Sequence, residues 1–534
     1  MKLLLDVAAG LGIFIYGMTL MGEGLQKAAG QKLKSIVGAL TKSTLRGILV
    51  GALITCIIQS SSATTVMVVG FVNAKIMTLS QAIGVIMGAN IGTTMTGFII
   101  ALNLAKYAPI MILIGMVLYV AGKNKSTKSK AQICLGLGLL FMGIKVLEGG
   151  LKPLAGNEVF TRFITQLENP FFGLLIGIVI TTILQSSSAA IGVLQALGFQ
   201  GLITYGAAMP VVLGSNIGST TTALISSFGA HKTAKRAALV HLLFNLIGSL
   251  IFLAIFILLK DKVINLFETY LNGLPTQIAI GHLIFNIIST LIFFPLTKAL
   301  VKITEKIIPG SDNDDQEVTN LDRRMLTTPS IALAQAADET KRMGTEVLRS
   351  LSLTQDMMLE EKYSLFDKIM EREATINKME KEITRYLVEL SHSTISTSEH
   401  KMVDDLLYAI NDIERVGDHI KNIAELSTDM MEENLRFTGS GKDELKEMFE
   451  KCYDAFKLAL ESYFEQNTQK ASLALKLEEE VDNMEEKFRN NHIKRLANKY
   501  CDAMPGIVFL DCISNLERVS DHANNIATYT LDRK

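Results

Sequence analysis

Tryptophan is absent from the 534-residue chain, and its five cysteines form no C-x-x-C pair and share no regular spacing. This pattern argues against a disulfide framework and against a thiolate metal site, and is typical of scattered free thiols in a reducing environment. Without tryptophan, an aromatic belt at a membrane interface would consist of tyrosine with phenylalanine behind it. The sequence also lacks a nucleotide-binding loop, a metalloprotease helix and the spacing of a catalytic triad. We therefore expect neither an enzyme nor a nucleic-acid-binding protein.

Charge is missing from one long stretch, since residues 171–230 contain no Asp, Glu, Lys or Arg. Up to Glu305 the chain has apolar runs of about 20 residues, the length with which a helix crosses a bilayer. This part has 22 Lys and Arg against 8 Asp and Glu, whereas the remainder has 30 against 45. We predict an all-α protein with a membrane domain over residues 1–305 and a soluble domain after it. The first 22 residues carry Asp6 and no clear cleavage site, so we interpret them as a retained first span.

The membrane domain repeats itself at an offset of 126 residues, without a gap from Leu11 to Thr96. A Gln-Ser-Ser-Ser block at Gln59–Ser62 returns at Gln185–Ser188, and each block is followed 31 residues later by Asn-Ile-Gly. Repeats of this kind build many secondary transporters, in which the substrate site lies at the repeat interface near the bilayer midplane. The predicted parts are repeat 1 over about residues 3–122, repeat 2 over about 131–260 and a final helix over about 276–301.

The basic segments of the membrane domain predict its topology. Residues 123–130 and 231–236 should be cytoplasmic, and so should 26–46, which has five Lys and Arg. The counterpart of that last segment, 152–172, has two basic and two acidic residues, so equivalent segments prefer opposite sides. Three apolar stretches lie between the cytoplasmic segments of repeat 1, where an even number of crossings is required, and repeat 2 has the same excess. Each repeat should therefore contain a re-entrant or broken element at the Gln-Ser-Ser-Ser or Asn-Ile-Gly segment, and the repeats should be inverted.

A helix that breaks inside a membrane exposes free N–H groups where its second half begins, and the helix dipole adds about half a positive charge there. An anion belongs at such an N-terminus, where serine hydroxyls can donate hydrogen bonds together with the N–H groups. A sodium ion would be held by amide, hydroxyl and carbonyl oxygens. The candidate anion ligands are Gln59, Ser60, Ser61, Ser62, Thr64, Gln185, Ser186, Ser187 and Ser188. The candidate sodium ligands are Thr55, Gln59, Asn90, Thr93, Thr94, Thr181, Gln185, Asn216, Ser219 and Thr220.

Other interpretations of these polar residues stay open. Small hydroxyl residues also serve helix packing, although packing does not require Gln and Asn in hydrocarbon. An intramembrane serine hydrolase is disfavoured, because neither block has a G-x-S-x-G turn and no acidic residue lies nearby. Two later helices share a His-x-x-x-Asn spacing that begins at His241 and His282. We interpret it as hydrogen bonding between helices, with support of the anion site as the alternative.

The paired serine blocks, the GANIGTT and GSNIGST segments and the HLIFN sequence from His282 resemble the type II sodium/phosphate cotransporter family over nearly the whole membrane domain. The resemblance implies inverted repeats, phosphate as substrate and sodium as driving ion, in a multi-pass protein of the cell inner membrane. This sequence departs from internal symmetry at Thr64, whose counterpart is Ala190. We therefore expect the two half-sites to differ, with one doing more of the binding.

A polar linker over residues 306–329 leads to a C-terminal half, residues 330–534, in which apolar residues recur every three or four positions without a strand pattern. This half is an all-α bundle by that pattern, and it repeats at an offset of 103 residues. Its polar trios are Glu414, Asp418 and Asn422, and Glu517, Asp521 and Asn525. Each trio lines one helix face and could bind a hard cation through oxygen, the alternative being a solvated acidic face. We expect His419 and His522 to be salt-bridged or surface residues rather than ligands.

The repeated acidic helix resembles the PhoU family, in which two three-helix bundles hold metal clusters on E-x-x-x-D motifs. The resemblance implies a divalent or iron-type metal cluster at the trios, a cytoplasmic location and regulation of phosphate uptake. Further partners to be tested are a second copy of this chain, in a homodimer, and phosphate-signalling proteins. The two halves together predict a sodium-coupled phosphate symporter with a cytoplasmic regulatory domain. The alternatives are a phosphate exporter, a carrier of another oxyanion such as sulfate, and a membrane-anchored phosphate sensor.

Overall fold

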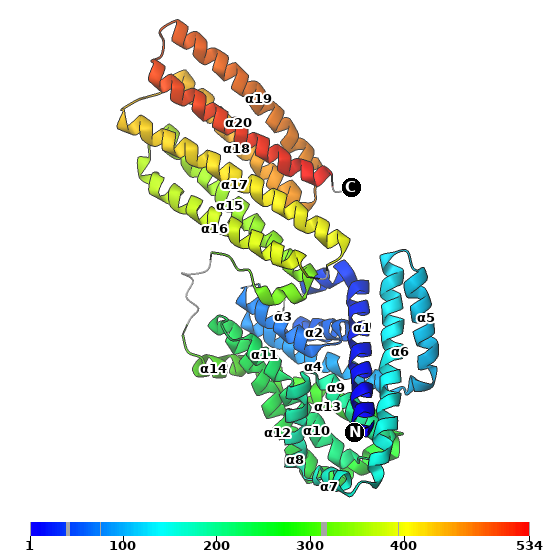
Figure 1. Ribbon diagram of the computed structural model, residues 1–534. Helices are drawn as coiled ribbons and strands as arrows, with labels where there is room; N and C mark the ends of the chain where they lie inside the picture. Colours follow the sequence, from blue (N-terminus) through cyan, green and yellow to red (C-terminus); the bar gives the residue numbers. More distant parts are fainter. Residues whose placement is uncertain (1, 39–42, 75, 311–317, 394, 533–534) are drawn as a thin grey trace. The chain divides into compact units, whose positions relative to one another are not determined.

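The computed structural model describes residues 2–38, 43–74, 76–310, 318–393 and 395–532, and within these ranges the chain is helical and has no strand (Figure 1). It divides into two compact units, Met1–Asn313 and Asp314–Lys534. The division falls inside the predicted linker. In the described part of the first unit, six helices are long and apolar enough to cross a membrane, or seven if the bent pair α7 and α8 forms one span.

The helices of the first unit follow the sequence repeat. Those of repeat 1 are α1 (Lys2–Gly38), α2 (Thr44–Ile58), α3 (Ser61–Asn73), α4 (Leu79–Ala101) and α5 (Ala108–Ala121). Those of repeat 2 are α6 (Lys125–Leu151), α7 (Glu158–Gln166), α8 (Pro170–Leu184), α9 (Ser187–Phe199), α10 (Tyr205–Gly218) and α11 (Thr220–Ser226). Both ends of α8 and α9 lie 126 residues after those of α2 and α3, so the repeat governs the helix boundaries as well as the residues. The inverted orientation of the repeats stays a prediction.

Glycine lets the helices of each repeat pack backbone against backbone. α2 packs against α4 and α8 against α10. A Cβ atom on Gly51 would lie 2.2 Å from the carbonyl oxygen of Val85, and one on Gly177 would lie 2.1 Å from that of Val211. These distances are far inside van der Waals contact, so only glycine permits this packing. The long helices α1 and α6 pack against each other in the same way, through Gly17 and Gly143 among others.

The last helices of this unit differ from the predicted boundaries. They are α12 (Lys232–Tyr270), α13 (Leu274–Phe293) and α14 (Thr297–Ile307). α12 continues past residue 260, the predicted end of repeat 2, although it is kinked at Leu259. The predicted single helix over 276–301 is wrong, because α13 ends at Phe293 and α14 begins four residues later. Pro295 explains the interruption, since it lacks the N–H group that would continue the hydrogen-bond ladder of the helix.

The second unit consists of two three-helix bundles (Figure 1). The first contains α15 (Pro329–Glu360), α16 (Phe366–Ser391) and α17 (Thr397–Glu432), and the second α18 (Gly439–Glu465), α19 (Thr468–Ala497) and α20 (Ala503–Leu531). The bundles meet where α17 packs against α20 and α15 against α18. Ile413 and Val416 of α17 and their counterparts Leu516 and Val519 of α20 are fully buried, so the 103-residue repeat also sets the core.

Candidate functional site

Both membrane repeats break their helices at the first serine of the Gln-Ser-Ser-Ser block. α2 ends just before Gln59, which is left-handed with φ 59°, Ser60 is extended, and α3 begins at the next residue. Gln185, with φ 51°, and Ser186 form the same break between α8 and α9. A left-handed residue with a side chain costs about 1–3 kcal/mol. The same cost is present at the same position in both repeats, and the predicted break at this block is confirmed.

The Asn-Ile-Gly segments stay close to helical in both repeats. α4 runs without interruption through Asn90 and Gly92, and in repeat 2 the single residue Ser219, with helical φ −63° and ψ −18°, separates α10 from α11. The sharp break of each repeat is therefore the one at the Gln-Ser-Ser-Ser block.

The serine after each left-handed glutamine caps the following helix. The Ser60 hydroxyl oxygen accepts a hydrogen bond of 3.1 Å from the backbone N–H of Ala63, and that of Ser186 accepts one of 3.1 Å from Ala189. The hydroxyl hydrogens of both caps stay available to a ligand. Within each helix the first N–H groups after the cap have no acceptor, and the helix dipole makes this end positive. Each break therefore presents N–H groups and serine hydroxyls as hydrogen-bond donors.

Both breaks border one cavity of about 300 Å³, which is lined by all four residues of each Gln-Ser-Ser-Ser block. The N-termini of α3 and α9 thus border a common space. The rest of the lining is Ile58 of α2 and six residues of α1, namely Ile15, Met18, Thr19, Gly22, Glu23 and Gln26. Gly22 allows α1 to approach the first break, since a Cβ atom there would lie 2.9 Å from the carbonyl oxygen of Ile58.

The structure brings eight of the nine candidate anion ligands to this cavity and leaves Thr64 outside it. Thr64 is fully buried, its hydroxyl donates to the carbonyl of Ser60 at 3.0 Å, and it accepts a hydrogen bond from Thr55 at 3.0 Å. Its hydroxyl thus stabilises the break between α2 and α3 and does not line the cavity. In repeat 2 the counterpart of Thr64 is Ala190, which has no hydroxyl. The buried hydroxyl of Thr181, the counterpart of Thr55, has no hydrogen-bond partner among the described residues.

The candidate sodium ligands are not gathered at the cavity. Only Gln59 and Gln185 line it. Four hydroxyls donate at 2.7–2.9 Å to carbonyls of their own helical turn, and these belong to Thr93, Thr94, Ser219 and Thr220. A hydroxyl that donates in this way keeps its oxygen lone pairs for a cation.

Two further candidate sodium ligands, Asn90 and Asn216, join the His-x-x-x-Asn helices to the repeats. The Asn90 amide donates to Asn245 of α12 at 2.8 Å, and the Asn216 amide donates to Asn286 of α13 at 3.3 Å. His282 bonds the amide oxygen of Asn216 at 3.0 Å. All of these side chains are buried. The interpretation of these helices as hydrogen-bonded to neighbouring helices is confirmed for Asn245, Asn286 and His282. Neither ring nitrogen of His241 has a hydrogen-bond partner among the described residues.

Sequence reasoning missed two residues of this region. Thr96 of α4 connects the repeats, because its hydroxyl donates to the amide oxygen of Gln59 at 3.0 Å and accepts from Ser188 at 3.4 Å. Thr96 is the last residue of the gapless sequence repeat, and this was the available signal. Glu23 places a carboxylate at the cavity, although the serine blocks themselves contain no charge. Nothing in the repeat indicated Glu23, whose counterpart is Gly149.

Acidic residues gather at matched positions of the two C-terminal bundles. In the second bundle, carboxylate oxygens of Glu478, Asp482 and Asp521 all lie within 4.8 Å of one another. Burial and then the neighbouring Asp521 raise the pKa values of Glu517 and Asp482. Such a set of close carboxylates fits a hard cation, whose charge would replace this mutual repulsion. The predicted trio omitted Glu478 and Asp482, although their E-x-x-x-D spacing on α19 was a usable signal.

The first bundle has acidic residues in the corresponding region, but among the described residues no three of their carboxylates come as close together as those of the second bundle. Burial and then Asp418 raise the pKa of Glu414, and Glu380 and Glu373 of α16 contribute further. Arg415 lies 3.6 Å from Asp418 and partly offsets this charge.

The asparagines of both trios turn toward the other bundle. The Asn422 amide donates to Asn515 at 3.3 Å, and the Asn525 amide donates to Asp412 at 3.1 Å. These amides therefore take part in the bundle interface between α17 and α20. His522 lies there too, in a salt bridge of 2.8 Å with Asp412, as the sequence predicted for a salt-bridged histidine.

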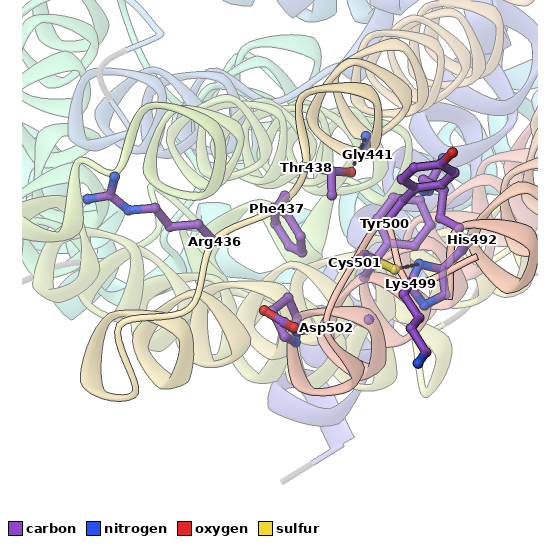
Figure 2. A pocket seen from close by; sticks show the side chains of 13 residues that line it. Arg436, Phe437, Thr438, Gly441, His492, Lys499, Tyr500, Cys501 and Asp502 are labelled. Atoms are coloured by element: carbon purple, nitrogen blue, oxygen red, sulfur yellow. Dashed lines mark hydrogen bonds between the residues drawn. The ribbon is translucent and has the colours of Figure 1, made fainter. Parts of the chain in front are cut away.

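A second cavity, of about 200 Å³, lies at one end of the second bundle (Figure 2). Figure 2 shows Cys501 beside His492, with the sulfur 3.9 Å from Nδ1. Two arginines of the lining are paired with carboxylates, Arg495 with Glu444 at 2.7 Å and Arg436 with Glu361 at 4.0 Å. We assign this cavity no ligand.

Comparison with known proteins finds a family match for each of the two units. The Na+/Pi-cotransporter family model matches residues 13–149 and 142–258. The uncharacterized protein YqeW of Bacillus subtilis is 33% identical over 252 residues, which cover 46% of this chain and 81% of that protein. The chain belongs to the Na+/Pi-cotransporter family. As a member of that family with several membrane-spanning helices, it is a multi-pass membrane protein.

This cotransporter-family chain carries an additional domain, since the PhoU domain model matches residues 340–427 and 445–530. The same combination extends to a relative from Escherichia coli strain K12, named putative inorganic phosphate export protein YjbB. It is 24% identical over 100% of this chain and 98% of its own length. Sodium-dependent phosphate transport protein 2B of Pongo abelii is 26% identical over 35% of this chain and 28% of that protein.

Proposed function

We propose that this protein is a sodium-coupled carrier of inorganic phosphate in the cell inner membrane, with a cytoplasmic PhoU domain that regulates it. The observation that supports this most is the cavity at which the N-termini of α3 and α9 meet, each with its Gln-Ser-Ser-Ser block. Family membership and the names of the relatives support phosphate as the solute.

Phosphate would be held by dipoles. Its oxygens would accept hydrogen bonds from the first N–H groups of α3 and α9 and from serine hydroxyls, above all those of Ser61 and Ser187. The cavity lining contains no Arg or Lys. A carrier must release its solute in every cycle, and an anion held only by dipoles escapes more readily than one in a buried bidentate pair with arginine.

Sodium would offset the charge of the anion in the same region. The amide oxygens of Gln59 and Gln185 and the carboxylate of Glu23 are the oxygen groups of the cavity that suit a hard cation. The hydroxyls of Thr93, Thr94, Ser219 and Thr220 are further candidates, because each keeps lone pairs free. Glu23 is paired with Lys27 at 3.4 Å in an exposed ion pair. Coupling follows if the anion binds well only when a cation reduces the negative charge of Glu23 further than this weak pair does.

Flux into proteoliposomes tests this proposal. We expect labelled phosphate to accumulate when sodium is supplied outside, and to accumulate far less when potassium or choline replaces it. Ser61→Ala and Ser187→Ala should each weaken uptake, whereas Ser80→Ala, at an exposed position in the first turn of α4, should not. Phosphate uptake that is the same in sodium and in choline would overturn the coupling.

Export is a second candidate, favoured by one observation. The relative that matches the whole chain, PhoU region included, is named a putative inorganic phosphate export protein. Inside-out and right-side-out membrane vesicles with the same sodium gradient distinguish net export from net uptake.

The remaining alternatives have their own tests. Competition between labelled phosphate and unlabelled sulfate separates a phosphate carrier from a general oxyanion carrier. A sensor would bind phosphate but show no counterflow exchange in phosphate-loaded vesicles.

We also propose that the acidic clusters of the PhoU domain hold metal ions. Elemental analysis of protein purified without chelator should find a divalent or iron-type metal. The double substitution Glu478→Gln and Asp482→Asn should lower the metal content, whereas Glu479→Gln, at an exposed neighbouring position, should leave it unchanged. Equal metal content in all three proteins would count against this site.

A further inference from the structure

The two repeats have equivalent motifs but adopt different local conformations around the cavity. Gln59 is 7% exposed, and its side chain is held by Thr96. Gln185 occupies the same left-handed position in repeat 2, yet it is exposed and makes no side-chain hydrogen bond within the described chain. Both glutamines thus line the cavity, but the side chain of Gln59 is held by a hydrogen bond whereas that of Gln185 is free.

Thr96 and its counterpart Thr222 also differ in their hydrogen bonds. Thr96 bridges the repeats by donating to Gln59 and accepting from Ser188. Thr222 donates instead to the carbonyl of Ser219 at 3.1 Å, within its own turn.

We propose that Thr96 and Thr222 are positioning residues that alternate during the transport cycle. In the conformation described here Thr96 links Gln59 to Ser188. In the opposite conformation Thr222 links Gln185 to Ser62, the residues found by applying the 126-residue offset in both directions. This inference rests on the proposed carrier function, since a carrier needs two related states of similar free energy.

The hydrogen-bond chemistry suits such an exchange. A threonine hydroxyl has one proton to donate and lone pairs to accept, so it can join one glutamine oxygen and one serine hydroxyl at a time. Thr222 holds its proton on a carbonyl of its own turn, a bond that it can give up without leaving a charge unpaired. Each state therefore holds one glutamine by a hydrogen bond and leaves the other free for the solute.

Single substitutions at Thr96 and Thr222 test the exchange, with the rate at which a cysteine in the cavity is chemically modified as the readout. Thr19→Cys, in a background without the five native cysteines, introduces a thiol on the α1 wall of the cavity, outside the proposed exchange. We expect Thr96→Val to slow its modification by a membrane-impermeant thiol reagent about fivefold, the effect of losing one hydrogen bond that favours this conformation. Thr222→Val should leave the rate unchanged or raise it, and both variants should slow phosphate flux.

Thr96→Ser retains the hydroxyl and should restore the reporter rate, which distinguishes positioning from a general packing defect. Should Thr96→Val fail to fold, Thr222→Val still decides, because Thr222 makes only a local bond in this conformation. The proposal is overturned if the two valine variants shift the rate in the same direction, or if neither shifts it.

Disulfide trapping provides an independent measurement. The pair Thr96→Cys and Ser188→Cys should cross-link and arrest flux with the reporter site reactive, because the two hydroxyl oxygens lie 3.4 Å apart here. The pair Ser62→Cys and Thr222→Cys should cross-link only in protein that visits the other state, and should protect the reporter site. Flux without any cross-linking of this second pair contradicts the exchange. Opposite reporter shifts without sodium-dependent flux would instead contradict the proposed function alone.

Discussion

At the scale of single residues, the serines of each block divide their tasks. Ser60 and Ser186 cap helices, whereas Ser61 and Ser187 begin them and line the cavity with uncommitted donors. The sequence identified all of these serines but could not separate caps from ligands, because neighbouring residues at a helix start differ only in backbone angles. It also assigned Thr64 to the anion, whereas its hydroxyl is consumed by Thr55 and Ser60.

This division of tasks predicts opposite phenotypes for neighbouring substitutions. Ser61→Ala should raise the KM for phosphate about tenfold, because a hydrogen bond to a charged group contributes about 1.5–3 kcal/mol, and should leave the melting temperature unchanged. Ser60→Ala should instead destabilise the protein by about 1 kcal/mol through the lost cap. Concentration-dependent uptake and thermal unfolding of the same preparations measure both effects. A common loss of stability in the two variants would show that both serines act structurally.

At the scale of helices, the break is held in place by close packing as well as by caps. α1 passes the first break with Gly22 near the Ile58 carbonyl and the Gln59 side chain. In the same helix, a Cβ atom on Gly12 would have no heavy atom within 4 Å. The two glycines therefore form a matched pair, one at a crowded position and one at an open position.

Gly22→Ala should destabilise the protein by about 1–3 kcal/mol and reduce transport, because the added methyl forces α1 away from the break. Gly12→Ala should be neutral or stabilising by up to about 1 kcal/mol, since alanine favours the helix over glycine. Thermal unfolding in detergent, followed by flux measurements, tests the pair. Equal behaviour of the two variants would contradict the close approach of α1 to the break.

The sequence predicted helix identity well and helix ends less well. The 126-residue repeat located the break at Gln59 and Gln185, because a repeated polar block in hydrocarbon is a strong local signal. The end of α13 was missed although Pro295 was visible, since a long apolar run outweighed one proline. The bond from Thr96 to Gln59 and Ser188 was beyond the sequence, because residues from distant helices meet only in the packed structure.

At the scale of the whole chain, a membrane unit of a phosphate-transporter family is joined to a helical unit with an excess of Asp and Glu. Composition alone separated the two units, since their charge balances are opposite in sign. The neighbouring helices that add carboxylates to the acidic faces of α17 and α20 were less predictable. α17 and α20 were recognised by their repeat, but α16 and α19 complete the clusters with residues that lack such a repeat.

The acidic clusters make the stability of the C-terminal unit depend on pH and on metal. Burial and neighbouring carboxylates raise the pKa values of Glu414, Glu478 and Glu517 above the ordinary value of 4.5. A raised pKa means that the folded state binds these protons more tightly, so this stabilisation is complete below about pH 4.5 and is lost as pH rises through the raised values.

We therefore expect the metal-free full-length protein to unfold at a lower temperature at pH 7.5 than at pH 4.5, in the transition assigned to this unit. Added Mg²⁺ or Mn²⁺ should raise that temperature more at pH 7.5, where protons no longer compete for the carboxylates. Calorimetry with Glu478→Gln and Asp482→Asn should show both effects reduced. A metal-induced shift that is identical at the two pH values would contradict this arrangement.

The uncapped N–H groups at the start of α3 and α9 limit what side-chain mutagenesis can reveal. Every amino acid except proline supplies the same main-chain donor, so replacing one serine after another should yield graded defects and no single indispensable position. Exchange of one peptide link for an ester, which deletes an N–H group and leaves the side chain intact, is the manipulation that reaches this hidden part of the cavity. A family built in this way can vary its side chains and still retain affinity for oxyanions.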